Sequence, residues 1–91
     1  MYFVYVLQSV RPRGNKNYYI GVTNNLLKRI GEHNSPINRG YTRNNYWRIV
    51  YIEAYLKASV ARTRERKLKQ HGSVWYAVMR RIRHYIGGIS Y

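Results

Sequence analysis

The sequence predicts an α+β fold: a small antiparallel three-stranded sheet flanked by helices, in the order β-β-α-β-α-α. Two observations lead to this prediction. Three short runs rich in β-branched and aromatic residues are bounded by turn-forming segments, as strands are. Three other segments repeat apolar residues at intervals of three and four, as amphipathic helices do. With 91 residues, the chain suits a single domain, residues 1–91, with a modest core.

The first two strands are expected to form a hairpin. Residues Tyr2 to Leu7 are β-branched or aromatic and apolar on both faces, which is typical of a central or well-covered strand. A turn-rich loop over residues 11–17 separates them from a second strand, Tyr18 to Val22. Gly21 lies inside this second strand, where it weakens the strand and often marks the close approach of another group.

A short helix and a third strand follow. Leu26 to Asn34 is predicted to be helical, with Leu27 and Ile30 facing the core and with caps available in residues 23–25. After a polar loop, the segment 47–56 alternates. Its even positions are apolar: Val50, Ile52, Ala54 and Leu56. This alternation predicts a half-buried strand that turns its even positions inward.

Two helices complete the predicted order. Ser59 can cap the first and Gly72 can close it, while Ser73 can cap a last, basic helix over residues 73–88. We expect Gly87 and Gly88 to end that helix. Its apolar stripe consists of Val74, Trp75, Val78, Ile82, Tyr85 and Ile86, and this stripe is expected to cover the core.

Charge limits the possible partners. Seventeen Lys and Arg against three acids give a net charge of +14, which predicts a polyanionic partner, most commonly nucleic acid, with an anionic membrane as the second choice. The absence of cysteine excludes disulfides and thiolate metal sites. No signal peptide or membrane-spanning run is recognisable, so we expect a cytoplasmic protein.

Glu65 is the most informative acid. It shares one predicted helix face with Ala58, Ala61 and Leu68, so its carboxylate is expected to point toward the core. Burying a carboxylate is costly unless a positive group holds it, which suggests a bound cation. The alternative is a surface residue paired with Arg62 or Lys69 on a rotated helix.

Four other residues can support phosphate chemistry. Tyr5 and Tyr19 can project from the same face of the predicted hairpin, although a single tyrosine taken alone is more often a packed aromatic residue than a catalyst. Arg29 and His33 are four residues apart and share a helix face, either as a solvated basic surface or as a pair that binds phosphate and moves a proton.

The motifs together resemble the GIY-YIG nuclease superfamily, in particular its small single-domain branch. Phe3-Val4-Tyr5 corresponds to the first half-motif, with Phe-Val in place of Gly-Ile, and Tyr19-Ile20-Gly21 to the second. The segment GVTNNLLKRIGEHN, the strand IVYIEAY and the helix ARTRERKLK follow in the order of the family. The C-terminal stretch from Val74 to Tyr91 matches no core motif.

The resemblance implies a DNA endonuclease that depends on a divalent metal. Glu65 would be the sole protein ligand of Mg²⁺ or Mn²⁺, and Arg29 would neutralise charge on the transition state. Tyr5 would take a proton from the attacking water, with its pKa lowered by the surrounding positive charge. Tyr19 would place the water and His33 would accept or relay the proton, leaving a 5′-phosphate.

Substrate contacts are also expected from polar and basic side chains on the same segments: Thr23, Lys28, Asn34, Arg43 and Lys69. The domain is too small for a sequence-reading module, so we expect structure-selective or weakly selective cleavage of DNA, with RNA as a further possible partner. Two alternatives stay open: a nucleic-acid-binding module that does not cleave, and a scaffold at a membrane surface that uses the basic C-terminal helix.

Overall fold

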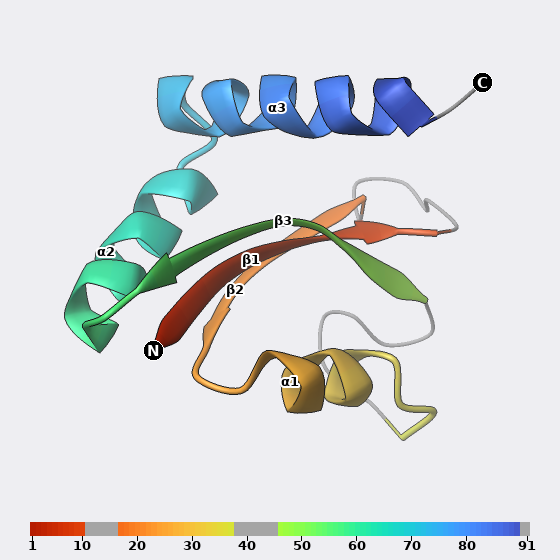
Figure 1. Cartoon of the computed structure of the whole chain (residues 1–91), viewed down its shortest axis with the longest axis vertical. Coiled ribbons are helices and arrows are strands. Elements are labelled where there is room, and N and C mark those ends of the chain that lie inside the picture. The colour runs from red at the N-terminus through yellow and green to blue at the C-terminus, as the bar shows by residue number, and fades with distance from the viewer. Residues whose placement is uncertain (11–16, 38–45, 90–91) are drawn as a thin grey trace.

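A computed structural model describes residues 1–10, 17–37 and 46–89 of the chain, the last five of them by their backbone alone. In these segments the elements follow the predicted order (Figure 1). They are β1 (Tyr2–Ser9), β2 (Tyr18–Thr23), α1 (Leu26–His33), β3 (Trp47–Tyr55), α2 (Ala58–Lys69) and α3 (Ser73–Ile89). The α+β class and the three-stranded antiparallel sheet are therefore confirmed.

The sheet has the order β2-β1-β3, with both pairings antiparallel. The central position of β1 explains why its sequence is apolar on both faces, because both faces are covered. Figure 1 shows α1 on one side of the sheet and α3 on the other, with α2 beside the strands. Helix α2 contacts all three strands, β1, β2 and β3.

Two hydrophobic clusters lie on opposite faces of the sheet. On the α2 and α3 side, Val4, Val6 and Ile20 pack against both helices. On the α1 side, Tyr5, Leu7 and Trp47 are buried under the helix. The alternation of side chains along β1 thus divides its residues between a larger apolar core and a smaller aromatic one.

The predicted inward face of β3 holds at Val50, which packs against the core, and is wrong beyond it. Ile52 is 44% exposed and Ala54 is also exposed, whereas the odd positions Tyr51, Glu53 and Tyr55 are partly buried. The cause is an irregularity in the pairing with β1: Val6 pairs with Tyr51, but its neighbour Leu7 pairs with Ile49. The extra residue in β3 exchanges the two faces of the strand.

The prediction for the core side of α1 is corrected at one position. Leu27 is 87% exposed, whereas Leu26 and Ile30 pack against the aromatic cluster beside Tyr5. His33 is buried at the end of the helix. The inward face therefore follows the spacing of Leu26, Ile30 and His33, and Leu27 is rotated away from the sheet.

The helix ends differ from the predicted caps. Lys57 takes the N-cap position of α2 without a side-chain hydrogen bond, so Ser59 lies inside the first turn. After α2, the residue with a positive φ, of 55°, is His71 rather than Gly72. In α3, Ser73 is already helical, and the helix runs through Gly87 and Gly88 to Ile89.

The described part of α3 covers the core as expected. Trp75, Val78 and Ile82 are buried, and so is Met79, which was not assigned to the stripe. The side chains of Tyr85 and Ile86 lie outside the described residues. Among the described residues, no helix combines the length and the apolar character that crossing a membrane requires.

Candidate active site

Tyr5 forms the centre of the site because the neighbouring strand has no side chain at the position opposite. Tyr5 pairs with Gly21 across the sheet, and its ring lies over the glycine. A Cβ atom on Gly21 would overlap the Tyr5 hydroxyl. The glycine expected to mark a close approach does so, and the approaching group is the Tyr5 phenol.

Two more rings join Tyr5. Its hydroxyl shares a 2.8 Å hydrogen bond with Nε2 of His33, which lies at the end of α1. The ring of Tyr19 lies beside both, with centroids 6.2 Å from Tyr5 and 4.6 Å from His33. Residues from two strands and one helix thus form a three-ring cluster, and the two phenols lie on the same face as predicted.

Arg29 supplies the positive charge on this side of the sheet. Its guanidinium lies close enough to the Tyr5 hydroxyl to lower the pKa of the phenol through charge and hydrogen bonding. The side chain is 42% exposed and also pairs with Glu32, with 3.2 Å between Nη1 and Oε1. An exposed surface pair of this kind is weak, so Arg29 can exchange Glu32 for a phosphate oxygen.

The protein itself does not lower the pKa of Tyr5, which corrects the expectation for this residue. Burial raises the pKa well above its usual value, and nearby Tyr19 and Glu65 act in the same direction. Arg29 opposes the shift without cancelling it. Burial also lowers the pKa of His33, and the charge of Arg29 adds to this effect.

The two pKa shifts are complementary. A protonated phenol and a neutral imidazole form a donor–acceptor pair: in the tautomer with its proton on Nδ1, His33 accepts at Nε2 the hydrogen that Tyr5 donates. Both shifts hold the proton on Tyr5 in the resting site, so neither a stable phenolate nor a charged imidazole is favoured there.

Glu65 comes from α2, which packs against β1 and β2. It lies between the buried residues Ala61 and Leu68, and its side chain is 17% exposed. Its Oε2 is 3.6 Å from Nζ of Lys69, so part of the surface-pair alternative also holds. The charge of Glu65 contributes to the raised pKa of Tyr5, as the smallest of the named effects, so its place in the site stays a prediction.

The donor set suits a hard, weakly held cation. No group of three or more His, Cys, Asp or Glu side chains gathers as a metal cluster in the part of the chain that the structure describes. Glu65 offers carboxylate oxygen, the ligand type that Mg²⁺ and Mn²⁺ prefer, and its only described charge partner is an exposed lysine. The residues present fit one such ion with water and substrate as its other ligands.

The predicted DNA contacts have different surroundings. Lys28 and Lys69 are exposed, and Thr23 forms the turn before α1 through hydrogen bonds between its hydroxyl and the Asn25 backbone. Both amide atoms of Asn34 bond to the backbone of Trp47, at 3.0 and 2.7 Å. Asn34 therefore ties α1 to β3, and its expected DNA contact finds no support. Arg43 lies outside the described residues.

One charged residue was missed from the sequence. Glu53, on β3, receives bonds from Arg64 Nε at 2.8 Å and from the hydroxyls of Tyr51 and Tyr55 at 2.5 and 2.7 Å. A second bond joins Arg64 Nη2 to the carboxylate at 2.8 Å. This cluster fixes α2 against the sheet and so fixes the position of Glu65. The sequence contains a pattern that could have identified this cluster, because Glu53 lies on a strand with a tyrosine two residues away on each side.

A comparison with known protein families finds a match. The family model of the GIY-YIG catalytic domain matches residues 1–75, which include every element except most of α3. No curated protein matches the chain, and neither does any solved structure.

Proposed function

This chain belongs to the GIY-YIG family, a family of endonucleases, and on that premise we propose that it hydrolyses DNA phosphodiester bonds with the help of a divalent metal. Nucleases of this family generally use divalent metals. The family match covers residues 1–75, more than three quarters of the chain.

One observation carries the proposal: Tyr5 and Tyr19 from adjacent strands and His33 from α1 form a ring cluster over Gly21, and the charges of Arg29 and of Glu65 from α2 act on the Tyr5 phenol. The five residues span most of the sequence and come from four separate elements. A proton acceptor, a cation and a carboxylate within one small site are the components of phosphodiester hydrolysis.

In the proposed mechanism, a proton passes through Tyr5 to His33. As water attacks the phosphorus, Tyr5 accepts the water proton while its own hydroxyl proton moves to Nε2 of His33 along the 2.8 Å hydrogen bond. The phenol then never carries a full charge, which agrees with its raised pKa. Tyr19 lies beside both rings and would hold the water in place.

Arg29 and Glu65 would act on the phosphate. Arg29 would leave Glu32 and bind the oxygens that gain charge in the transition state. Glu65 would hold the metal ion, which when bound supplies charge neutralisation for the leaving oxygen. The exposed side chains of Lys28 and Lys69 would contact neighbouring phosphates, and the product would carry a 5′-phosphate.

The decisive experiment is a cleavage panel. Labelled DNA and RNA, as duplexes, flaps, branches and single strands, would be incubated with the protein in Mg²⁺, in Mn²⁺ and in a chelator. We expect metal-dependent nicking by the wild-type protein and loss of at least about a hundredfold in Glu65→Gln, which keeps the length of the side chain. Thr63→Ala, an exposed change on the same helix, is the matched control and should retain activity.

Equal nicking by wild type and Glu65→Gln would contradict the proposal, since a contaminating nuclease would then explain the activity. Salt-sensitive binding without cleavage in any metal or substrate would instead identify a binding module of this fold. Circular dichroism of each variant distinguishes loss of the site from loss of the fold.

A further inference from the structure

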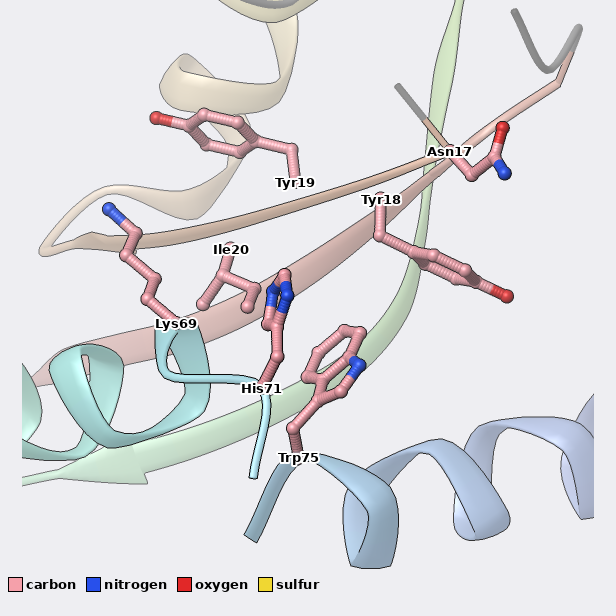
Figure 2. A pocket seen from close by; sticks show the side chains of 7 residues that line it. All are labelled: Asn17, Tyr18, Tyr19, Ile20, Lys69, His71 and Trp75. Atoms are coloured by element: carbon pink, nitrogen blue, oxygen red, sulfur yellow. The ribbon is translucent and has the colours of Figure 1, made fainter. Parts of the chain in front are cut away.

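An aromatic hollow opens beside the catalytic cluster, on the other side of β2. It has a volume of about 610 Å³ and is lined by Asn17, Tyr18, Tyr19, Ile20, Lys69, His71 and Trp75. Figure 2 shows His71 and Trp75 next to each other below β2, with Tyr19 on the opposite side of the strand. The side-chain alternation of β2 explains this: Tyr18 and Ile20 face the hollow, and Tyr19 faces α1.

The hollow presents flat aromatic rings. The His71 imidazole stacks on the Trp75 indole, with centroids 5.1 Å apart and planes at 30°. Tyr18 meets Trp75 edge to face at 5.9 Å. Trp75 is largely buried and fixes the stack, whereas His71 is exposed and can offer its outer face to a planar ligand.

The backbone conformation of His71 favours a role for this residue in ligand binding. This residue follows α2 with φ of 55°, a position where glycine is the usual occupant, and Gly72 is its immediate neighbour. A left-handed non-glycine residue costs free energy, and such residues cluster at binding sites. At this position the chain has an imidazole ring, which lines the hollow and which a glycine could not provide.

Polar groups lie at the rim of the hollow. Lys69 points from α2 toward the edge of β2, and its Nζ is 3.6 Å from the Glu65 carboxylate (Figure 2). Lys69 therefore belongs both to the hollow and to the catalytic site. At the other end, Oδ1 of Asn17 is buried without a hydrogen-bond partner among the described residues.

From these features we propose that the hollow binds one unpaired nucleobase of the substrate, adjacent to the scissile phosphate. The base stacks on the His71–Trp75 pair, while Lys69 contacts the phosphate between this base and the catalytic centre. A base paired within a duplex cannot reach the hollow, so the preferred substrate contains an unpaired nucleotide next to the cleaved bond. This assignment of substrate class rests on the proposed nuclease function.

The test measures stacking without cleavage. Short single-stranded DNA carrying the fluorescent base 2-aminopurine at successive positions would be bound to the wild-type protein in a chelator. We expect quenching of the fluorescence at one or two positions, because stacking on aromatic rings quenches this base. Replacing that one nucleotide by an abasic residue should weaken binding about tenfold.

Two variants test His71 without straining the backbone. Both His71→Gly and His71→Asn suit a positive φ and lack the aromatic ring. Each should remove the quenching, weaken binding about tenfold and become insensitive to the abasic substitution. Tyr76→Phe, an exposed change on α3 outside the lining of the hollow, is the matched control and should retain the quenching.

Unchanged quenching in both folded His71 variants, or no quenching at any position in the wild type, overturns the nucleobase site even if the protein cleaves DNA. Quenching that disappears in the variants supports the site even if no metal restores cleavage. The failure of this inference and the failure of the nuclease proposal are therefore separate results.

Discussion

At the scale of single residues, the site depends on the missing side chain at Gly21. The Tyr5 ring occupies the space that a Cβ atom would need. We expect Gly21→Ala to displace the phenol from His33, to lower activity at least about tenfold and to cost about 1–3 kcal/mol of stability. Cleavage assays and thermal melts check this. An active Gly21→Ala protein with an unchanged melting temperature would show that the ring position is unimportant.

Tyr5 and His33 give a second prediction at this scale. Tyr5→Phe keeps the packing but removes the proton path, so cleavage should fall about 100- to 10,000-fold with little change in DNA binding. Because the pKa of His33 is lowered, the imidazole stays neutral to below the usual histidine range. Activity should therefore decline only when the pH falls below that range, and a pH–rate profile of the wild type checks it.

The sequence predicted candidates for the site but not their protonation. The candidates could be proposed because their spacing and motif order are visible in the sequence: Tyr5, Tyr19, Arg29, His33 and Glu65. The raised pKa of Tyr5 follows from complete burial, which depends on the helix above it and on the strand beside it. The hydrogen bonds between Asn34 and the Trp47 backbone could not be predicted, because the two residues are far apart in the sequence.

At the scale of elements, the Glu53 cluster determines how α2 lies on the sheet. Glu53→Gln leaves the two tyrosines and Arg64 poorly compensated, so we expect a loss of about 2–4 kcal/mol in the free energy of unfolding. Glu32→Gln removes a half-exposed pair and should cost less than about 1 kcal/mol. Denaturant unfolding of both variants compares them; equal losses would mean that the cluster is not stabilising.

The same cluster predicts an acid-sensitive fold. Burial pushes the pKa of Glu53 upward, but hydrogen bonds from Arg64 and the tyrosines lower it to about 2. A depressed pKa in the folded state stabilises the protein above the unfolded value of about 4.3, and this contribution, about 2–3 kcal/mol, is lost as the pH falls toward 2. Unfolding free energies measured down this range should fall in the wild type and change less in Glu53→Gln.

The type and order of the elements could be predicted from hydrophobic patterns that extend over many residues. Features that depend on a single residue, such as the inward face of a strand or the end of a helix, could not. The order of strands and helices followed from the patterns along the chain. The inward face of β3 did not, because one extra residue opposite Val6 and Leu7 reverses it. The end of α2 was assigned to Gly72 by residue preference, whereas the chain places His71 in the left-handed conformation.

At the scale of the whole molecule, the charge of +14 predicts strongly salt-dependent binding. The logarithm of the DNA affinity should fall linearly with the logarithm of salt concentration, by about 0.7 per phosphate contacted on a single strand. Lys28→Gln and Lys69→Gln should each reduce the slope by about one contact. Fluorescence anisotropy over a salt series measures these slopes, and unchanged slopes would place the DNA on another face.

The ion pair between Lys69 and Glu65 has a consequence for the order of assembly. In the free protein, the ammonium group of Lys69 is paired with the Glu65 carboxylate. A divalent ion that takes Glu65 would release the ammonium to the nucleic acid, so the two ligands should strengthen each other through reciprocal linkage. Calorimetry with Tyr5→Phe should show tighter Mg²⁺ binding once DNA is present, and Lys69→Gln should abolish most of that coupling.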